Sequence, residues 1–311
     1  MRSRLQFLPL ALLLLTGLAL LAQNTAPEQA SPETTFKVDV HLVNVFTTVT
    51  DERGTPIGGL TKDQFEVFED GVPQKISVFS RESQLPLSIV LAVDTSSSTR
   101  REIRLELDAA RDFTHAILRK QDSLALYQFD QAVTEVVSFT SDLNRIDRGI
   151  HNITVGGATA LYDAIYLGAD ALLARQGRKV LVLITDGGDT VSSTSYAEAL
   201  RAAQQSEALV YSIIVVPVES SAGRNTGGEH ALIQLAADTG GKYYYAANLP
   251  EIRKAFTQIS DELRTQYLLA YYSNRRLAAS DYREIEVKAH LPSDNKLIVR
   301  HRRGYYTSKL H

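Results

Sequence analysis

Three short stretches of the sequence carry oxygen-bearing side chains that could hold a divalent cation. The first has Asp94, Ser96 and Ser98 at alternate positions. The second contains Thr159 after a Gly-Gly-Ala run, and the third begins with Asp186 followed by a Gly-Gly pair. Alternation lets the first three side chains turn toward one point, and two neighbouring loops can complete a cage of oxygens. Two carboxylates and three hydroxyls, without sulfur or imidazole, suit Mg²⁺ or Mn²⁺, with Ca²⁺ less well matched and zinc disfavoured.

Each stretch lies next to an element that would bring it to one edge of a sheet. The expected strands 88–93 and 180–185 are apolar except for Ser88 and Thr185 and end directly before the two aspartates, and residues 160–174, with helical spacing, follow the threonine. Ligands of an open parallel sheet bind at the carboxyl ends of its strands, so we expect the three stretches to meet there. A single Ser or Asp before a helix is explained as well by helix capping, but five positions together favour a cation.

Strands and helices alternate from about residue 87 to about residue 263. The expected strands are 88–93, 123–129, 133–139, 180–185, 210–216 and 243–246, and the expected helices are 103–118, 160–174, 196–206, 231–238 and 250–263. Apolar strands separated by helices indicate a mostly parallel sheet that is covered on both faces. The sequence therefore predicts an α/β fold with a doubly wound sheet in residues 85–264.

The two flanks of this region have β patterns instead. Residues 36–84 largely alternate apolar and polar side chains and include an Asp-Gly hairpin signal at Asp70. Residues 265–311 contain further expected strands at 267–272, 285–290 and 297–301. Because each flank is too short to form a closed sandwich alone, we expect them to pair into one small β-sandwich around the inserted α/β domain. Extension of the α/β sheet by each flank is the alternative.

The beginning of the sequence has the pattern of an export signal. Arg2 and Arg4 precede an almost unbroken apolar run, so residues 1–22 resemble a secretory signal peptide or, at nearly spanning length, a membrane anchor. Residues 23–35 contain Pro, Ser, Thr and Glu without periodicity and are expected to be a disordered linker. We therefore expect an exported protein that is periplasmic, secreted or membrane-anchored, with membrane contact only if the first segment is retained.

Composition and missing motifs disfavour several functions. A formal charge of -3 gives no reason to expect a nucleic-acid partner. The absence of cysteine removes thiolate nucleophiles and thiolate metal sites. No Gly-x-Ser-x-Gly elbow is present, no histidine adjoins Ser96 in sequence, and no Gly-Lys-Ser/Thr follows the glycine pairs. We therefore expect neither an enzyme nor a nucleotide-binding protein.

Two other clusters have structural interpretations. The tyrosines at 243–245 and at 271–272 are typical of half-buried packing in β segments, although they could form an aromatic binding surface. The basic residues at 300–303 are expected to solvate the end of a strand rather than to bind a polyanion.

The three polar stretches together resemble the metal-ion-dependent adhesion site of von Willebrand factor A domains. That motif is Asp-x-Ser-x-Ser, a distant Thr and a distant Asp, and all five positions match in family order over about residues 85–263. The segments 59–71 and 303–306 in the flanks are similar to exported proteins related to this family that occur chiefly in Acidobacteria.

The resemblance implies a role for each matched residue. Ser96, Ser98 and Thr159 would bind the cation directly, and Asp94 and Asp186 directly or through water. In that family an acidic side chain of a protein partner fills the remaining coordination position. The resemblance thus implies a cation-dependent, adhesion-type protein-binding module. The alternative is a structural or assembly factor of the cell envelope in which the metal only stabilises the loops.

Overall fold

The computed structural model describes residues 42–81, 85–97, 103–216, 226–274, 282–291 and 296–307. The expected signal segment 1–22 and linker 23–35 lie outside these ranges. The described strands are β1 Leu42–Thr50, β2 Phe65–Glu69, β3 Val72–Gln74, β4 Ile76–Arg81, β5 Leu87–Asp94, β6 Ser123–Phe129, β7 Val133–Thr140, β8 Arg178–Thr185, β9 Leu209–Val215, β10 Lys242–Ala246, β11 Tyr267–Tyr272, β12 Tyr282–Ala289, β13 Ile298–Arg300 and β14 Gly304–Tyr306. The helices are η1 Lys62–Gln64, α1 Ile103–Ile117, α2 Leu143–His151, α3 Leu161–Leu173, α4 Tyr196–Ser206, α5 Thr226–Thr239 and α6 Leu249–Thr265.

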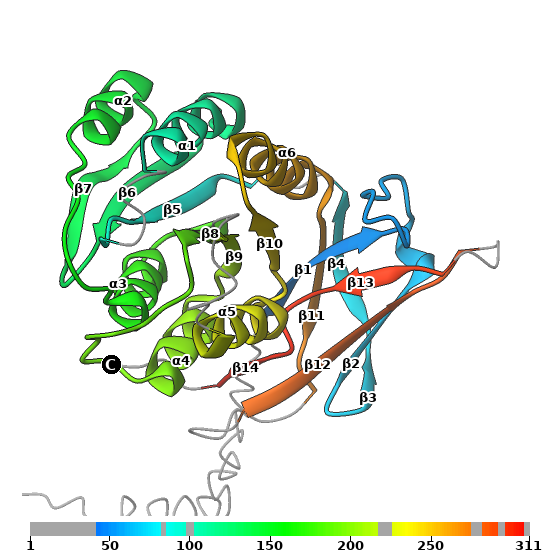
Figure 1. Ribbon diagram of the computed structural model, residues 1–311. Helices are drawn as coiled ribbons and strands as arrows, with labels where there is room; N and C mark the ends of the chain where they lie inside the picture. The colour runs from blue at the N-terminus through cyan, green and yellow to red at the C-terminus, as the bar shows by residue number, and fades with distance from the viewer. Residues whose placement is uncertain are drawn as a thin grey trace, which may run out of the picture. The chain divides into compact units, whose positions relative to one another are not determined.

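Six strands form the central sheet in the order β10-β9-β8-β5-β6-β7 (Figure 1). All neighbours are parallel except β7, which runs antiparallel to β6. Helices α1, α2 and α6 pack on one face of the sheet, and α3, α4 and α5 pack on the other. The predicted doubly wound α/β fold is confirmed.

Both faces of the central strands are buried, which explains their unbroken apolar sequences. In β5, Ile89 and Leu91 belong to the core under α1, α2 and α6, whereas Val90 and Ala92 belong to the core under α3, α4 and α5. Because successive side chains of a strand point to opposite faces, a strand between two helical layers must be apolar at every position. This requirement distinguishes the central strands from the alternating strands of the flanks.

The flanking segments pair with one another in two antiparallel sheets. One sheet has the order β13-β1-β11-β4, and the other has the order β14-β12-β2-β3. Each sheet combines strands from before and after the α/β region, because β1 pairs with β11 and β2 pairs with β12. Within the described residues, the flanks therefore do not extend the central sheet.

A hydrogen-bond network around a buried ion pair joins these two sheets. The Glu69 carboxylate accepts hydrogen bonds from Arg283 Nη1 at 3.0 Å and Ser273 Oγ at 2.6 Å through one oxygen, and from Tyr271 at 2.8 Å and Tyr305 at 2.9 Å through the other. Glu69 and Arg283 are 0% and 1% exposed. Since Tyr271 lies on β11 and Glu69 on β2, the network fixes one sheet against the other.

The basic residues 300–303 attach the sandwich to the α/β domain. Arg300 Nη1 donates to the Gly241 carbonyl at 2.7 Å, and Arg303 forms an ion pair with Asp238 at 3.1 Å. A Cβ on Gly240 would lie 2.4 Å from the backbone of His301, so these two backbone segments are in close contact. The expectation that this segment solvates a strand end is wrong, because its partners lie in α5, the α5–β10 turn, α6 and the end of α4.

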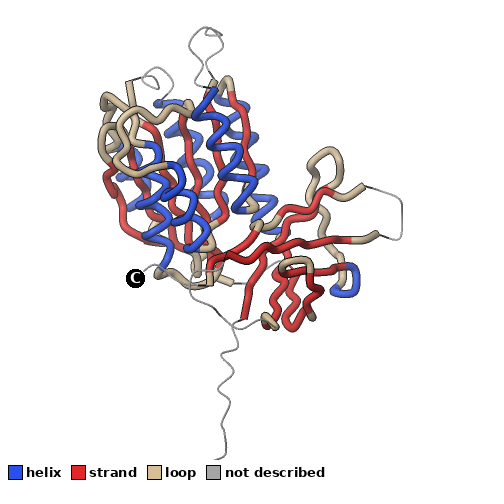
Figure 2. Tube along the Cα trace, turned by 90° about the horizontal axis from the view of Figure 1, so that it is seen from below, coloured by secondary structure: helices blue, strands red, loops and turns tan. Residues whose placement is uncertain are grey.

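This attachment lies at the amino end of β10 and hence at the edge of the central sheet opposite the strands' carboxyl ends. Figure 2 shows the sandwich strands at one end of the six-stranded sheet. Among the described helices, none has the length and apolarity to cross a membrane.

His301 is buried within the same segment. Its Nε2 accepts from the backbone N–H of Val287 at 3.1 Å, and its Nδ1 contacts the Arg302 carbonyl at 2.8 Å. This geometry suits the neutral ring with the proton on Nδ1. Burial lowers the pKa of His301 and the charge of Arg302 also lowers it, while the hydrogen bond to the Arg302 carbonyl and the charge of Glu286 raise it.

Breaking the buried ion pair should destabilise the fold strongly. Arg283→Met leaves the Glu69 carboxylate buried without its cation, so we expect the free energy of unfolding in urea to fall by about 3–5 kcal/mol. Lys288→Met, on the same strand, removes an exposed ion pair with Glu286 and an ammonium contact with the Phe68 ring, and should cost less than about 1 kcal/mol. Equal losses for the two variants would contradict the role of the network.

The buried histidine should make stability depend on pH. Because the folded state holds a proton on His301 less tightly than the unfolded state, its stabilising contribution is present above the ordinary pKa of 6.5 and is lost as the pH falls below it. The free energy of unfolding should therefore drop less between pH 7.5 and 5 in His301→Gln than in the wild type. His290→Gln, at an exposed site, should keep the wild-type slope.

Candidate metal-binding site

The Asp94 carboxylate lies at the buried carboxyl end of β5. One of its oxygens accepts from the backbone N–H of Ser96 at 2.9 Å, and the other accepts from the hydroxyl of Thr185 at 2.7 Å. Burial raises the pKa of Asp94 to about 6, the bonds from Thr185 and Ser96 oppose this rise, and the nearby charge of Asp186 adds to it. A buried carboxylate near a second, half-buried one favours a bound cation, whose charge would lower the pKa of Asp94.

Backbone hydrogen bonds join the first predicted stretch to the second. The N–H of Gly156 donates to the Thr95 carbonyl at 2.7 Å, and the N–H of Ser97 donates to the Gly157 carbonyl at 2.9 Å. Ser96, between these two bonds, is 1% exposed. The loop that carries Ser96 is thus held directly against the loop that leads to Thr159.

The second stretch is bonded in turn to the segment that follows the third. Thr159 donates its N–H to the Thr190 hydroxyl at 2.9 Å, and Thr190 returns its N–H to the Thr159 carbonyl at 2.8 Å. The Asp163 carboxylate accepts the N–H groups of Thr194 at 2.8 Å and Ser193 at 3.1 Å. Burial raises the pKa of Asp163, but these hydrogen bonds outweigh it and lower the pKa overall. Both loops are therefore fixed by the protein's own contacts.

The third stretch turns sharply beside β5 and α5. Asp186 is half-buried, and Gly187 has a φ of +92°, a conformation that favours glycine. The N–H of Gly187 donates to the Thr185 hydroxyl at 3.0 Å. A Cβ on Gly228, in the first turn of α5, would lie 1.3 Å from the Gly187 carbonyl oxygen, so only glycine permits this approach.

The structure brings the three predicted stretches to one edge of the central sheet. Asp94, Ser96 and Thr159 are buried and Asp186 is half-buried, whereas Ser98 lies outside the described residues. Within the described ranges, no group of three or more His, Asp or Glu side chains is arranged to hold a metal. A cation at this edge would therefore depend on hydroxyl oxygens together with the two carboxylates, a donor set that fits Mg²⁺ or Mn²⁺. Ligation by the five residues stays a prediction.

Sequence reasoning missed the residues that support the site. Thr185 was expected only as the last residue of a strand, yet its hydroxyl links Asp94 to Gly187. Asp163 and Asp189 were not singled out, although Asp189 accepts the N–H of Tyr162 at 3.2 Å. The one signal in the sequence that could have identified these supporting residues was their position, because each lies within a few residues of a predicted ligand.

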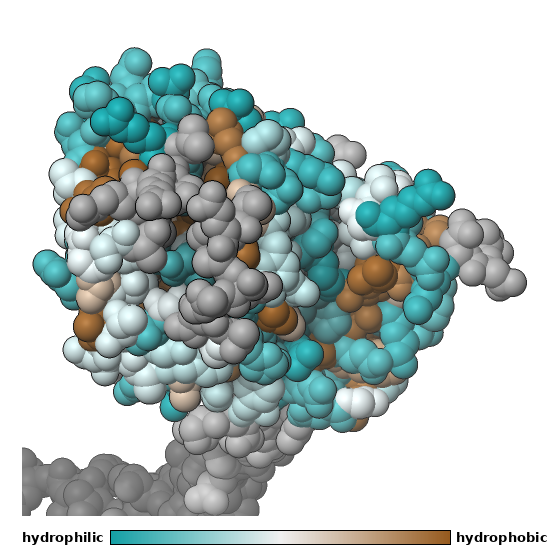
Figure 3. Space-filling view, in the orientation of Figure 1, coloured by the Kyte–Doolittle hydropathy of each residue, from teal (hydrophilic) through white to brown (hydrophobic). Residues whose placement is uncertain are grey.

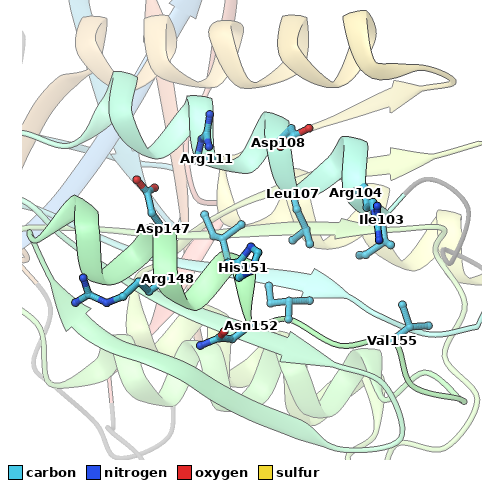
Figure 4. A pocket seen from close by; sticks show the side chains of 12 residues that line it. Ile103, Arg104, Leu107, Asp108, Arg111, Asp147, Arg148, His151, Asn152 and Val155 are labelled. Atoms are coloured by element: carbon cyan, nitrogen blue, oxygen red, sulfur yellow. The ribbon is translucent and has the colours of Figure 1, made fainter.

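An open groove of about 860 Å³ lies between α1 and α2. Its lining includes the apolar side chains of Leu107, Ile153 and Val155 and the charged side chains of Arg104 and Asp108. Figure 4 shows several of these side chains on α1 and α2 and in the segment that follows α2. The groove adjoins the candidate site in sequence, because α1 follows the first stretch and Val155 directly precedes the second. Its mixed charges indicate no particular small-molecule class.

Removal of the Thr185 hydroxyl should destabilise the site without any metal present. In Thr185→Val, the Asp94 carboxylate loses a donor and the Gly187 N–H loses an acceptor, so we expect the free energy of unfolding in EDTA to fall by about 1–3 kcal/mol. Thr134→Val makes the same change at an exposed position of β7 and should stay within about 0.5 kcal/mol of the wild type. A Thr185→Val value equal to that of Thr134→Val would show that the hydroxyl is not needed.

Comparison with known proteins identifies the region that contains these loops. Residues 89–188 match the family model described as von Willebrand factor type A domain. A comparison with curated proteins gives no match.

The chain is similar to several solved structures of low identity, and the first two described here share its fold. A von Willebrand factor type A protein from Catenulispora acidiphila is 9% identical, with a TM-score of 0.52 and coverage of 87% of this chain and 75% of that one. Proximal thread matrix protein 1 from the mussel byssus is 17% identical, with a TM-score of 0.51 and coverage of 63% and 51%. The conserved hypothetical protein BatB from Bacteroides thetaiotaomicron is 18% identical, with a TM-score of 0.47 and coverage of 58% and 100%.

The sequence match and the doubly wound sheet agree on the same region of the chain. Residues 89–188 are thus similar in sequence to von Willebrand factor type A domains, and the chain shares its fold with a solved protein of that type.

Proposed function

We propose that this chain is an exported protein-binding module that captures an acidic side chain of a protein partner through a divalent cation. The observation that carries the proposal is the convergence of the three loops at the carboxyl edge of the sheet. There the buried Asp94 lies near the charge of Asp186, and the hydroxyl-bearing residues Ser96 and Thr159 lie in the adjoining loops. Type A domains are generally protein-interaction modules, which supports binding rather than catalysis.

The donor set supports Mg²⁺ as the first choice of cation, with Mn²⁺ as a close equivalent and Ca²⁺ as a poorer one. Ser96, Ser98 and Thr159 would bind it directly, and Asp94 and Asp186 directly or through water. A cation with few direct negative ligands keeps a strong attraction for one more carboxylate. The partner's Asp or Glu would supply that group at the open coordination position.

One face of the molecule shows mostly hydrophilic side chains among its described residues (Figure 3). On the face that Figure 3 shows, apolar side chains form small separate patches among hydrophilic ones. A broad apolar patch is the usual mark of an interface that depends on hydrophobic burial. A metal-bound carboxylate would give a partner an anchor that does not depend on such a patch.

The alternative is an envelope assembly factor in which the metal only holds the loops. The hydrogen bonds from Thr190 to Thr159 and from Thr194 to Asp163 disfavour this role, because they already fix the loops. A cation is therefore better explained by what it offers to a partner. Export and any membrane attachment rest on the predicted signal or anchor in residues 1–22.

Loss of the second aspartate should abolish cation binding and partner capture together. Calorimetric titration with Mg²⁺ or Mn²⁺ should give one site in the wild type and a loss of affinity of about 10- to 100-fold or more in Asp186→Ala. Asp261→Ala, at an exposed position of α6, is the matched control and should bind as the wild type does.

Pull-downs from exported proteins, with Mg²⁺ or with EDTA, complete the test. Capture by the wild type should need Mg²⁺, and capture by Asp186→Ala should fail. Thermal unfolding of Asp186→Ala in EDTA should stay close to that of Asp261→Ala. Capture that survives EDTA would refute metal-dependent binding, and metal binding without any metal-dependent capture would favour the assembly role.

A further inference from the structure

A hydrogen bond outside the predicted ligand set supports the loop that carries Asp186. The first turn of α5 packs against Gly187. A Cβ on Gly187 would lie 3.3 Å from both the backbone nitrogen and Cγ of Glu229. The Gly187 carbonyl also meets Gly228 so closely that no side chain fits between them. The position of the third stretch is therefore set by the position of this helical turn.

A tyrosine on the edge strand holds this helical turn in place. The hydroxyl of Tyr245, on β10, donates to the Glu229 carboxylate at 3.0 Å. Glu229 is only 5% exposed. A buried carboxylate requires hydrogen-bond donors, and a negative charge is also favoured in the first turn of a helix by the helix dipole. The bond therefore fixes the Glu229 side chain between β10 and the glycine turn.

We propose that Tyr245 and Glu229 are positioning residues for the cation, which they do not touch. The bond joins β10 to α5, and α5 abuts Gly187, which directly follows Asp186. Without the bond, the first turn of α5 would be freer to move, and the Asp186 carboxylate would move with it. This role rests on the proposed cation binding and adds two residues to the machinery of that site.

The neighbouring tyrosine provides a matched control. Tyr243 lies on the same strand and packs edge-to-face on Tyr245, with ring centroids 5.7 Å apart. The two side chains are similarly exposed, at 38% and 43%. In the part of the chain that the structure describes, the hydroxyl of Tyr243 has no hydrogen bond. Tyr245→Phe and Tyr243→Phe therefore remove the same atom from the same aromatic pair, but only the first breaks the bond to Glu229.

The test is a titration of each full-length variant with Mn²⁺, followed by electron paramagnetic resonance of the free ion and by calorimetry. We expect Tyr245→Phe to weaken Mn²⁺ binding about tenfold, the lower end of the effect of outer residues on metal sites, and Tyr243→Phe to leave it unchanged. Thermal unfolding of the metal-free proteins should be similar for the two variants. Equal affinities would overturn the positioning role.

Two substitutions of Glu229 separate positioning from simple folding. Glu229→Gln keeps an acceptor for the Tyr245 hydroxyl and should retain most of the affinity, whereas Glu229→Ala should lose it as Tyr245→Phe does. Equal losses for Gln and Ala would refute a role for this hydrogen bond. If the wild type itself binds no Mn²⁺, the proposed function fails first, and the positioning role falls with it. If the wild type binds and all variants match it, the positioning role alone fails.

Discussion

The register between β5 and β8 is the constraint on which the candidate site depends. Val93 pairs with Ile184, so Asp94 and Thr185 leave their strands side by side and Asp186 follows one residue later. A shift of one residue would turn every side chain of a strand to the other face and bury it in the wrong core. The two apolar cores that fix this register therefore also fix the separation of the Asp94 and Asp186 carboxylates. The geometry of the site thus depends on hydrophobic packing along the strands that lead to it.

Much of the fold around the site could be predicted, because it depends on the order of apolar and polar residues within short segments. Unbroken apolar runs such as 180–185 identify strands that are buried on both faces, and the polar residues after them must emerge at one edge of a parallel sheet. The paired flanks were also predictable, since neither could form a sandwich alone. Helix α2 was missed although Asp142 caps it and Ile146 and Ile150 have helical spacing, because it is short and follows directly on a strand.

The supporting contacts could not be predicted, because each joins residues that are far apart in the sequence. The Glu69 and Arg283 pair lies across 214 positions, and neither residue has a local feature that marks it as buried. Residues 300–303 had the composition of a solvated strand end, and they attach the sandwich only through contacts with distant residues such as Gly241 and Glu262. Charged side chains are ordinarily exposed, so sequence reasoning places them on the surface unless their partner is known.

The pairing of β1 with β11 has a mechanical consequence. Leu42 lies opposite Tyr272 and Thr47 lies opposite Tyr267. Tyr267 is the first residue of β11, which follows directly from α6. Consider a force applied to the chain before Leu42 and opposed by a partner bound to the α/β domain. It would act on β1 at Leu42 and on β11 at Tyr267, which lie at opposite ends of this antiparallel pair. Tension along the strands would then shear all its hydrogen bonds together instead of opening them one by one. The strand order of the flanks thus gives this sheet resistance to a pull applied at those two ends.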